Sequence, residues 1–319
     1  MEVSTMTGLP QNSAQRESLH ISSVMAATDF SPASDRAIAE AVSIARHYGA
    51  KLHVFNIVSS LGIKLSGAGA MAAATVAAWR DTARLEEYLS LNRLVQDVNA
   101  SCIVSTRCVY EELESVARRE NIDLIVVGTR GRRGLWRLFV GSVAEQVFRN
   151  SSCPVLTVGP RMPMEWHTES AASERPILFA TDFGRASLEA LPRAISLANQ
   201  LRRRLALLHV LSDVPDPGDH WVQALDFIKL RDRLKATTIE KLARLIPQQA
   251  ALNQEPAYMV EFGEPAEGII RAATFLHAGV IILGLNHKTH IETASHLPWS
   301  SAYEVVCAVQ CPVLTLRNH

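Results

Sequence analysis

The chain has no excess of charge of either sign, because 32 lysine and arginine residues balance 32 aspartate and glutamate residues. A neutral protein has no general attraction to nucleic acid or to an anionic membrane surface. Long apolar runs are also missing, and those present, such as Val280–Leu285, are far too short to span a bilayer. These two absences argue against a nucleic-acid-binding protein and against a membrane protein.

Cysteine is scarce: there are five, and none belongs to a Cys-x-x-Cys motif. This usage fits a reducing compartment better than a disulfide framework. Cys307 and Cys311 lie four positions apart, but no second pair of ligands accompanies them, so no metal site is predicted. The first twenty residues are mostly polar and lack the apolar core of a signal peptide. We expect residues 1–20 to be a disordered leader and the protein to be cytoplasmic.

The sequence contains two copies of one pattern. Three segments recur in the same order: residues 24–31 (VMAATDFS) as 177–184 (ILFATDFG), residues 123–128 (DLIVVG) as 279–284 (GVIILG), and residues 153–158 (CPVLTV) as 311–316 (CPVLTL). Repeats at a nearly constant offset indicate homologous domains. We therefore predict a first domain at residues 21–159, a proline-containing linker at 160–175, and a second domain at 176–319.

Each half alternates short apolar strands with amphipathic helices. The predicted strands of the first half are residues 24–28, 52–58, about 102–109, 124–127 and 155–158, and the second half repeats them, for example at 205–211 and 257–262. Long helices are predicted at about 70–99 and 224–246. Continuous Val/Ile/Leu strands that alternate with helices indicate an α/β fold, with a parallel sheet covered on both faces.

The helix after the first strand has clear end signals. Ser31 is a natural N-cap, Pro32 fits the first helical position, and Gly49 is expected to end the helix. Its buried stripe is predicted to be Ala37, Ile38, Ala41, Val42 and Ala45. In the second half Pro192 falls inside the equivalent helix and is expected to bend or delay it.

The segment that carries chemistry follows the fourth strand of the first half: Gly128-Thr-Arg-Gly131, nine further residues, then Gly141-Ser142. Ligands of parallel α/β sheets bind beyond the carboxyl ends of the strands. Gly128 is expected to adopt backbone angles closed to other residues, and Gly131 and Gly141 leave the main chain open to a phosphate. Ser142 begins a helix whose free N–H groups and positive dipole end would face an anion.

The second half provides an internal control for these glycines. His287 stands in the place of Gly131 and Trp299 in the place of Gly141, while Ser301 still offers a helix cap. The fold therefore tolerates the loss of both glycines, and close approach of a ligand explains them better than the turn does. The segment is not a Walker A loop, because no Gly-Lys-Ser/Thr follows.

Together these motifs resemble the universal stress protein family. Gly128-x-x-Gly131-x9-Gly141-Ser142 matches the ATP-binding signature of that family without a gap, and the resemblance covers residues 21–159 and 174–317. It implies two tandem domains, each an open five-stranded parallel sheet with helices on both faces, of the adenine nucleotide alpha hydrolase-like kind. It also implies ATP, with ADP or AMP as alternatives, and Mg²⁺ bound through the phosphates.

The resemblance further implies which residues hold the nucleotide. Ala27, Thr28 and Asp29 would border the adenosine, with Ser31 close by, and Ile57 would pack on the adenine. The ribose and phosphates would be surrounded by Gly128, Arg130, Gly131, Gly141, Ser142 and Val143. The first half departs from the family in lacking a Gly-x-Pro turn after the third strand, which the second half keeps at residues 263–265.

Several of these residues also have a purely structural interpretation. Asp29 could cap the next helix, because its counterpart Asp182 survives in the half that lost its glycines. Ser142 could be an N-cap only. His287, His290 and His296 are interpreted as surface histidines, because no carboxylate at a matching offset suggests a metal site.

Three functions remain open from the sequence. The leading one is an ATP-binding regulatory protein of the stress response, without a catalytic residue set, because no nucleophile with a base lies near the glycines. The alternative is a slow ATPase or phosphotransferase that uses Asp29, and the third is a scaffold that binds no nucleotide. The closing strands of the halves are expected at sheet edges, where they could pair within the chain as a pseudo-dimer or support a homodimer.

Overall fold

The computed structural model describes residues 19–57, 80, 82–87, 89–90, 95–105, 109–129, 144, 147–149, 151–159, 175–213, 221–247, 250, 252–285 and 299–317. In the first half the elements are β1 (Ser23–Thr28), α2 (Pro32–Tyr48), β2 (Lys51–Ile57), β3 (Ala100–Ser105), α4 (Val109–Arg119), β4 (Leu124–Gly128) and β5 (Val155–Val158). In the second half they are β6 (Ile177–Ala180), α6 (Arg185–Gln200), β7 (Leu205–Leu211), α7 (Trp221–Ala243), β8 (Ala257–Phe262), α8 (Pro265–Phe275), β9 (Val280–Leu285), α9 (Trp299–Ala308) and β10 (Val313–Arg317). The chain is an α/β protein, as predicted.

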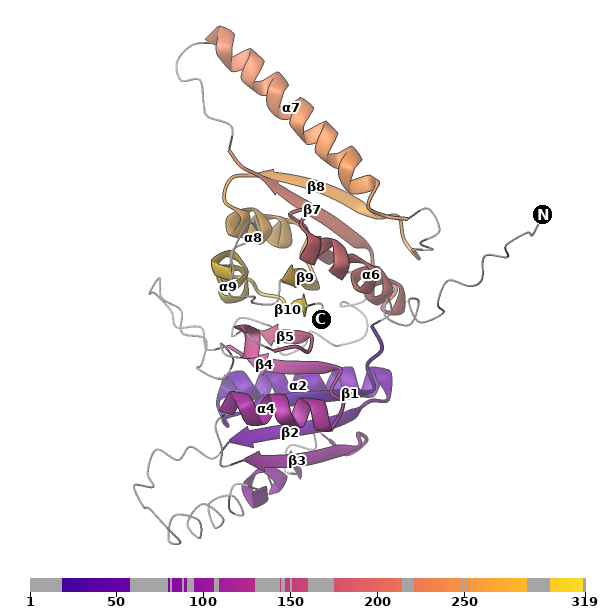
Figure 1. The fold of residues 1–319 in the computed structure, drawn as a ribbon, viewed down its shortest axis with the longest axis vertical. Coiled ribbons are helices and arrows are strands. Elements are labelled where there is room, and N and C mark those ends of the chain that lie inside the picture. Colours follow the sequence, from indigo (N-terminus) through magenta and orange to yellow (C-terminus); the bar gives the residue numbers. More distant parts are fainter. Residues whose placement is uncertain are drawn as a thin grey trace, which may run out of the picture.

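All of these strands join one sheet, which runs through the whole molecule (Figure 1). Its order is β3-β2-β1-β4-β5-β10-β9-β6-β7-β8. Within each half the strand pairs are parallel, but β5 and β10 pair antiparallel, with Leu156 opposite Leu314. The closing strands therefore lie in the middle of the sheet and not at its edges, which are formed by β3 and β8.

The helix α2 forms as its sequence signals predict. Ser31 accepts a hydrogen bond from the Ser34 N–H and closes a capping box with it, and Pro32 occupies the first turn. Gly49 ends the helix in the left-handed conformation, with φ 63°. The residues predicted for the apolar stripe are all buried: Ala37, Ile38, Ala41, Val42 and Ala45.

The two faces of the sheet carry separate cores because strand side chains alternate. In β1, Val24 and Ala26 point into the core under α2, while Met25 points into the core under α4. The helices on both faces shield these apolar strands from water (Figure 1). Near the start of the chain, Leu19 is only 6% exposed, and its carbonyl oxygen accepts a hydrogen bond from Gln200 on α6. The predicted leader therefore extends two residues too far, since Leu19 packs against the second half.

Three further predictions need correction. The third strand of the first half spans Ala100–Ser105, not residues 102–109, because it pairs along its full length with β2. Pro192 does not delay α6, which begins at Arg185 and continues through the proline to Gln200. Ser301 is not a cap, because α9 already begins at Trp299.

Buried charged residues of the two halves interact across the boundary between them. Burial lowers the pKa of Arg203 in the second half. The negative charge of Glu40, which is buried on α2, opposes this with a smaller effect. A Cβ at Gly279 would lie 2.8 Å from Nη1 of Arg203, so the missing side chain leaves room for the guanidinium. In the first half Asp123 stands at the corresponding position, and its carboxylate accepts hydrogen bonds from the N–H groups of Ser22 and Ser23.

Candidate functional site

The predicted adenosine residues lie where β1 ends and α2 begins. Thr28 donates its hydroxyl hydrogen bond to Oγ of Ser34 at 3.0 Å, and Phe30 adopts a left-handed φ of 58°. The second half repeats this turn, with Thr181 beside Ser187 at 2.9 Å and Phe183 also at φ 58°. A positive φ is costly for an aromatic residue, but its presence in both halves makes it a property of the fold.

Asp29 and Asp182 occupy equivalent positions but differ in their surroundings. Oδ1 of Asp182 accepts hydrogen bonds from Ser187 Oγ at 2.7 Å and from the Gly184 N–H at 2.8 Å. In the first half Ser31 caps the helix instead, and Oδ1 of Asp29 accepts a bond from the Ser31 N–H at 3.1 Å. Asp182 is partly buried against its helix, whereas Asp29 is exposed. Both aspartates thus accept an N–H two residues ahead, and Asp182 also accepts the hydroxyl of Ser187, a residue of α6.

Asn56, which the sequence analysis did not single out, is the main polar group at the end of β2. It is 2% exposed, and its Nδ2 donates to the carbonyl oxygen of Thr28 at 2.9 Å. Its Oδ1 is buried and has no hydrogen-bond partner in the part of the chain that the structure describes. A buried acceptor without a partner is costly, so this atom is a candidate for a ligand contact. The signal in the sequence was a single amide within the otherwise apolar end of the strand, directly before Ile57.

The second half fills the same place with a histidine. Nδ1 of His209 lies 2.7 Å from the carbonyl oxygen of Thr181, and its ring contacts Phe183 with centroids 4.5 Å apart. Burial, the largest effect, lowers the pKa of His209. Nδ1 of His209 thus takes the place that Nδ2 of Asn56 takes in the first half, with an aromatic ring beside it.

Gly128 has a different role from the one predicted. Its φ is not positive, and it is the last residue of β4. A Cβ on Gly128 would lie 2.2 Å from the carbonyl oxygen of Ala33, so the glycine lets α2 approach the strand. Gly284 does the same in the second half, where a Cβ would lie 2.4 Å from the carbonyl oxygen of Ala186. Helix packing therefore explains why both halves keep this glycine.

Cationic side chains face the two turns. The guanidinium of Arg84 lies 4.1 Å from the centre of the Phe30 ring, and Nζ of Lys241 lies 3.7 Å from the centre of the Phe183 ring. Such contacts hold a positive charge on an aromatic face. In the first half this charge lies next to the turn that carries Asp29.

The structure brings only part of the predicted site together. Thr28 is buried, Ala27 and Ser31 are half-buried, and Gly128 ends the adjacent strand. The remaining residues, together with the side chain of Ile57, lie outside the described part of the chain: Arg130, Gly131, Gly141, Ser142 and Val143. His287, His290 and His296 lie outside it as well.

Two other features of the described residues bear on function. They contain no group of three or more histidine, cysteine, aspartate or glutamate side chains that could hold a metal ion. No helix among them is both long and apolar enough to cross a bilayer.

Comparison with known proteins identifies the repeated fold. The model of the universal stress protein family matches residues 20–159 and 174–317. The chain belongs to the universal stress protein family. It carries two universal stress protein domains in tandem, each with the Thr-Asp-Phe turn described above.

Individual relatives agree with this assignment. Universal stress protein A homolog 1 of Coxiella burnetii is 30% identical over 146 residues, which are 44% of this chain and 97% of that relative. A universal stress protein of Methanocaldococcus jannaschii is 51% identical over 47 residues, so the chain matches only 28% of that relative's length and 15% of its own. The crystal structure of a universal stress protein from Archaeoglobus fulgidus aligns with 93% of this chain and 99% of its own, with a TM-score of 0.65 and 18% identity. This structural likeness extends over both domains.

Proposed function

We propose that this universal stress protein binds ATP in its first domain and acts as a nucleotide-dependent regulator of a stress response. The observation that carries the proposal is the contrast between the two equivalent turns. Asp182 accepts a hydrogen bond from Ser187 on its own helix, whereas Asp29 is exposed and accepts the Ser31 N–H. On β2, which pairs with β1, the buried Oδ1 of Asn56 has no hydrogen-bond partner among the described residues. The glycines of the signature are likewise present only in the first half at positions 131 and 141.

The chain's own residues suit an adenine nucleotide. Asp29 would accept hydrogen bonds from the ribose hydroxyls, and Oδ1 of Asn56 would accept one from a donor on the nucleoside. Arg130, Gly131, Gly141, Ser142 and Val143 would hold the phosphates through main-chain N–H groups and a helix N-terminus, with Mg²⁺ held by the phosphates. ADP or AMP would use the same nucleoside contacts.

Binding without turnover is the form of the proposal that the residues favour. Asp29 is the described carboxylate at the end of β1 that could orient water or a metal ion in the alternative, a slow ATPase or phosphotransferase. Retention of intact ATP through purification would favour the regulator, and steady release of phosphate that stops in Asp29→Ala would favour the enzyme.

We also propose that the two domains form a pseudo-dimer inside one chain, in a cytoplasmic protein. The antiparallel pairing of β5 with β10 uses the closing strand of each half, so those edges are satisfied internally. A mass of one chain in light scattering would support this arrangement, and a mass of two chains would support a homodimer. The described cysteines, 102, 153, 307 and 311, are all free, which agrees with a reducing compartment.

A matched pair of substitutions tests nucleotide binding in the first domain. In calorimetric titrations of the full chain, Asp29→Asn should weaken ATP binding at least about tenfold, because a hydrogen bond to a charged acceptor is lost. Asp182→Asn should leave ATP affinity unchanged and lower thermal stability, because it weakens the hydrogen bonds that Asp182 accepts from the Gly184 N–H and from Ser187. Equal affinities for all three proteins, or equal losses in both variants, would contradict the proposal.

A further inference from the structure

The strand β8 leaves one backbone edge of the sheet without a neighbouring strand. The Gly263 N–H donates to the carbonyl oxygen of Leu211 on the β7 side at 2.9 Å. Because parallel strands use alternate residues, Glu261 and Met259 also turn their backbone groups toward β7. The N–H and C=O groups of Tyr258, Val260 and Phe262 therefore face outward, along the open edge.

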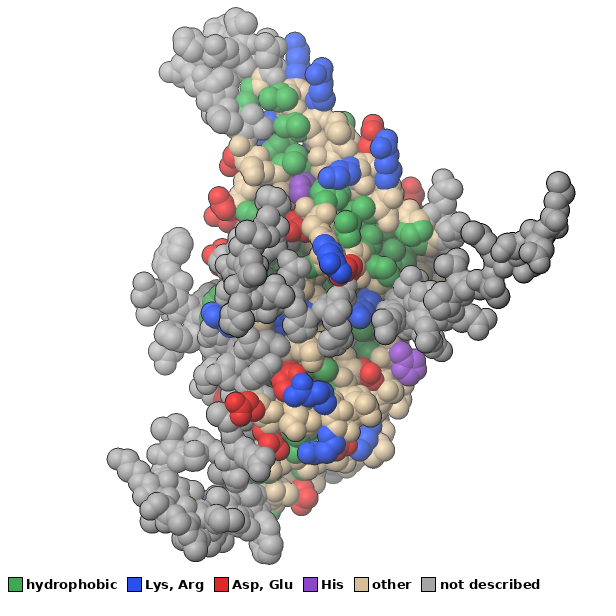
Figure 2. Space-filling view, viewed as in Figure 1, with side chains coloured by type: hydrophobic (Ala, Val, Ile, Leu, Met, Phe, Trp, Pro, Cys, Tyr) green, Lys and Arg blue, Asp and Glu red, His purple; other side chains and the backbone are tan. Residues whose placement is uncertain are grey.

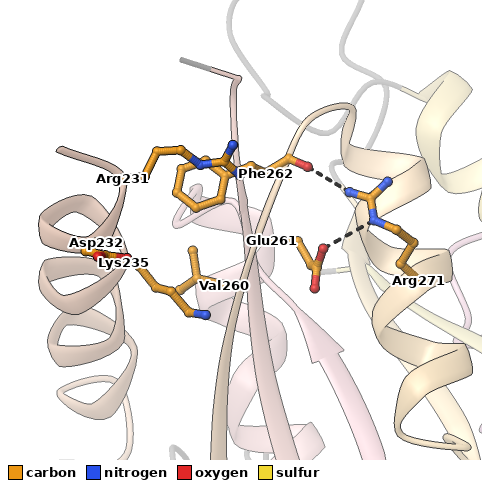
Figure 3. A pocket seen from close by; sticks show the side chains of 7 residues that line it. All are labelled: Arg231, Asp232, Lys235, Val260, Glu261, Phe262 and Arg271. Carbon is orange, nitrogen blue, oxygen red and sulfur yellow. Dashed lines mark hydrogen bonds and ion pairs between the residues drawn. The ribbon is translucent and has the colours of Figure 1, made fainter. Parts of the chain in front are cut away.

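A groove crosses this edge between α7 and α8. It has a volume of about 440 Å³ and is lined by Arg231, Asp232, Lys235, Val260, Glu261, Phe262 and Arg271. In Figure 3, the side chains of Arg231, Asp232 and Lys235 project from α7 and that of Arg271 projects from α8. The residues of β8 lie between them. The groove thus covers the end of β8 at Val260 and Phe262, with a helix on each side.

The groove carries more positive than negative charge. Arg231 and Lys235 lie one turn apart on α7, and among the described residues Lys235 has no ion-pair partner. The lining acids are Asp232, on α7 as well, and Glu261, which is paired with Arg271 at 3.2 Å, so one net positive charge remains. Lysine and arginine side chains gather over the end of the molecule where α7 lies (Figure 2). An acidic occupant would complement this surface.

One outward carbonyl group of β8 already accepts a hydrogen bond from a side chain. Nη2 of Arg271 donates to the carbonyl oxygen of Phe262 at 2.7 Å (Figure 3). On the other side of the strand end, the guanidinium of Arg231 lies 4.2 Å from the centre of the Phe262 ring. No described residue bonds to the outward backbone groups of Tyr258 and Val260. The edge is thus capped at its end and open along the residues before it.

We propose that this groove binds an extended acidic segment of a partner protein as an added strand beside β8. Main-chain hydrogen bonds to Tyr258 and Val260 would supply the pairing, and Arg231 and Lys235 would select acidic side chains. A second copy of this chain fits less well, because two β8 edges would bring the same basic side chains together. The proposal is independent of nucleotide binding, since β8 is at the far end of the sheet from β1 and β4, where the nucleotide is proposed to bind.

The test is a fluorescence-anisotropy titration of the full chain with a labelled peptide of alternating glutamate and valine. The peptide should bind, its affinity should fall as salt rises, and hydrogen exchange at the amides of Tyr258 and Val260 should slow. A peptide with lysine in place of glutamate should not bind. A peptide with N-methylated backbone amides should bind at least about tenfold more weakly, because it keeps the charge but cannot pair as a strand. Equal binding of the methylated peptide would overturn the proposal.

Two substitutions on α7 distinguish binding in the groove from general electrostatic attraction to this helix. Lys235→Glu should weaken peptide binding at least about tenfold, whereas Arg233→Glu, on α7 but outside the groove, should change it less than about twofold. Equal losses would mean that the peptide follows the charge of α7, and this would overturn the proposal. Binding of single-stranded nucleic acid with the same difference between the two variants would also overturn the proposal. A two-chain mass in light scattering that the peptide abolishes would overturn it as well.

Discussion

The guanidinium of Arg317, on the last strand of the second half, donates from Nη1 to the carbonyl oxygen of Ser151 in the first half at 2.9 Å. It also donates to the carbonyl oxygen of Phe148, and Arg317 is only 4% exposed. Phe148 is one of the helical residues 147–149 and Ser151 follows them, so the cation lies at the carboxyl end of this helical segment, where a positive charge is favourable. The side chain thus ties the two domains together beside the β5–β10 pair.

Removing this cation should destabilise the whole chain. Arg317→Met keeps much of the apolar stem but leaves two buried carbonyl groups without their donor, which costs about 2 kcal/mol. Urea denaturation should show the loss, and Arg185→Met provides a control because Arg185 pairs with Glu189 on the surface. Unchanged stability in Arg317→Met would mean that these interdomain hydrogen bonds do not contribute.

The glycines of the first domain should divide into structural and ligand-binding positions. Gly128→Ala should destabilise the protein by about 2 kcal/mol or more with or without nucleotide, because its Cβ would meet the backbone of Ala33. Gly131→His copies the second half, and we expect it to abolish ATP binding while thermal stability stays nearly the same. Thermal melts with and without ATP measure both effects. A stable Gly128→Ala variant would contradict the packing role, and full ATP affinity in Gly131→His would contradict the phosphate loop.

Asn56 should contribute to nucleotide binding in a way that a histidine cannot replace. Asn56→His copies His209, which makes the same bond to the preceding strand, so the fold should survive. The buried acceptor Oδ1 is lost, and ATP affinity should fall about tenfold. The reverse change, His209→Asn, should create no second ATP site, because the second half still lacks its glycines. Calorimetry gives both the affinity and the number of sites.

Ionisation of Tyr48 should lower the stability of the folded protein at alkaline pH. Burial raises the pKa of Tyr48 to about 12, with a smaller opposing effect from Arg203. The unfolded chain therefore releases this proton near pH 10, before the folded chain does, so stability falls between about pH 10 and 12. The buried hydroxyl has no hydrogen-bond partner among the residues described, so Tyr48→Phe should be neutral or stabilise by up to about 1 kcal/mol at pH 7. It should also show a smaller loss between pH 10 and 12, and identical profiles would contradict this account.

Local signals predicted the parts of the fold that depend on neighbouring residues. Ser31, Pro32 and Gly49 marked the ends of α2 because caps act within one turn, and the apolar runs at 155–158, 205–211 and 257–262 matched the strands observed. The third strand of the first half was displaced, because its limits depend on pairing with β2, which is distant in sequence.

Contacts between distant segments explain what the sequence did not reveal. The buried role of Arg317 depends on carbonyl groups 166 and 169 positions away. Gly128 was expected to need unusual backbone angles. The structure shows another reason for the glycine, which is the close approach of the Ala33 backbone from another element. Asn56 became visible as a site residue only when the structure showed a buried Oδ1 without a partner among the residues it describes.

The most direct test of the central claim is to denature the purified full chain and identify the released nucleotide by mass. We expect one adenine nucleotide per chain from the natural protein and none from Gly131→His. Two nucleotides per chain, or an equal yield from Gly131→His, would contradict an ATP site confined to the first domain. No nucleotide from the natural protein, even after incubation with excess ATP, would contradict nucleotide binding altogether.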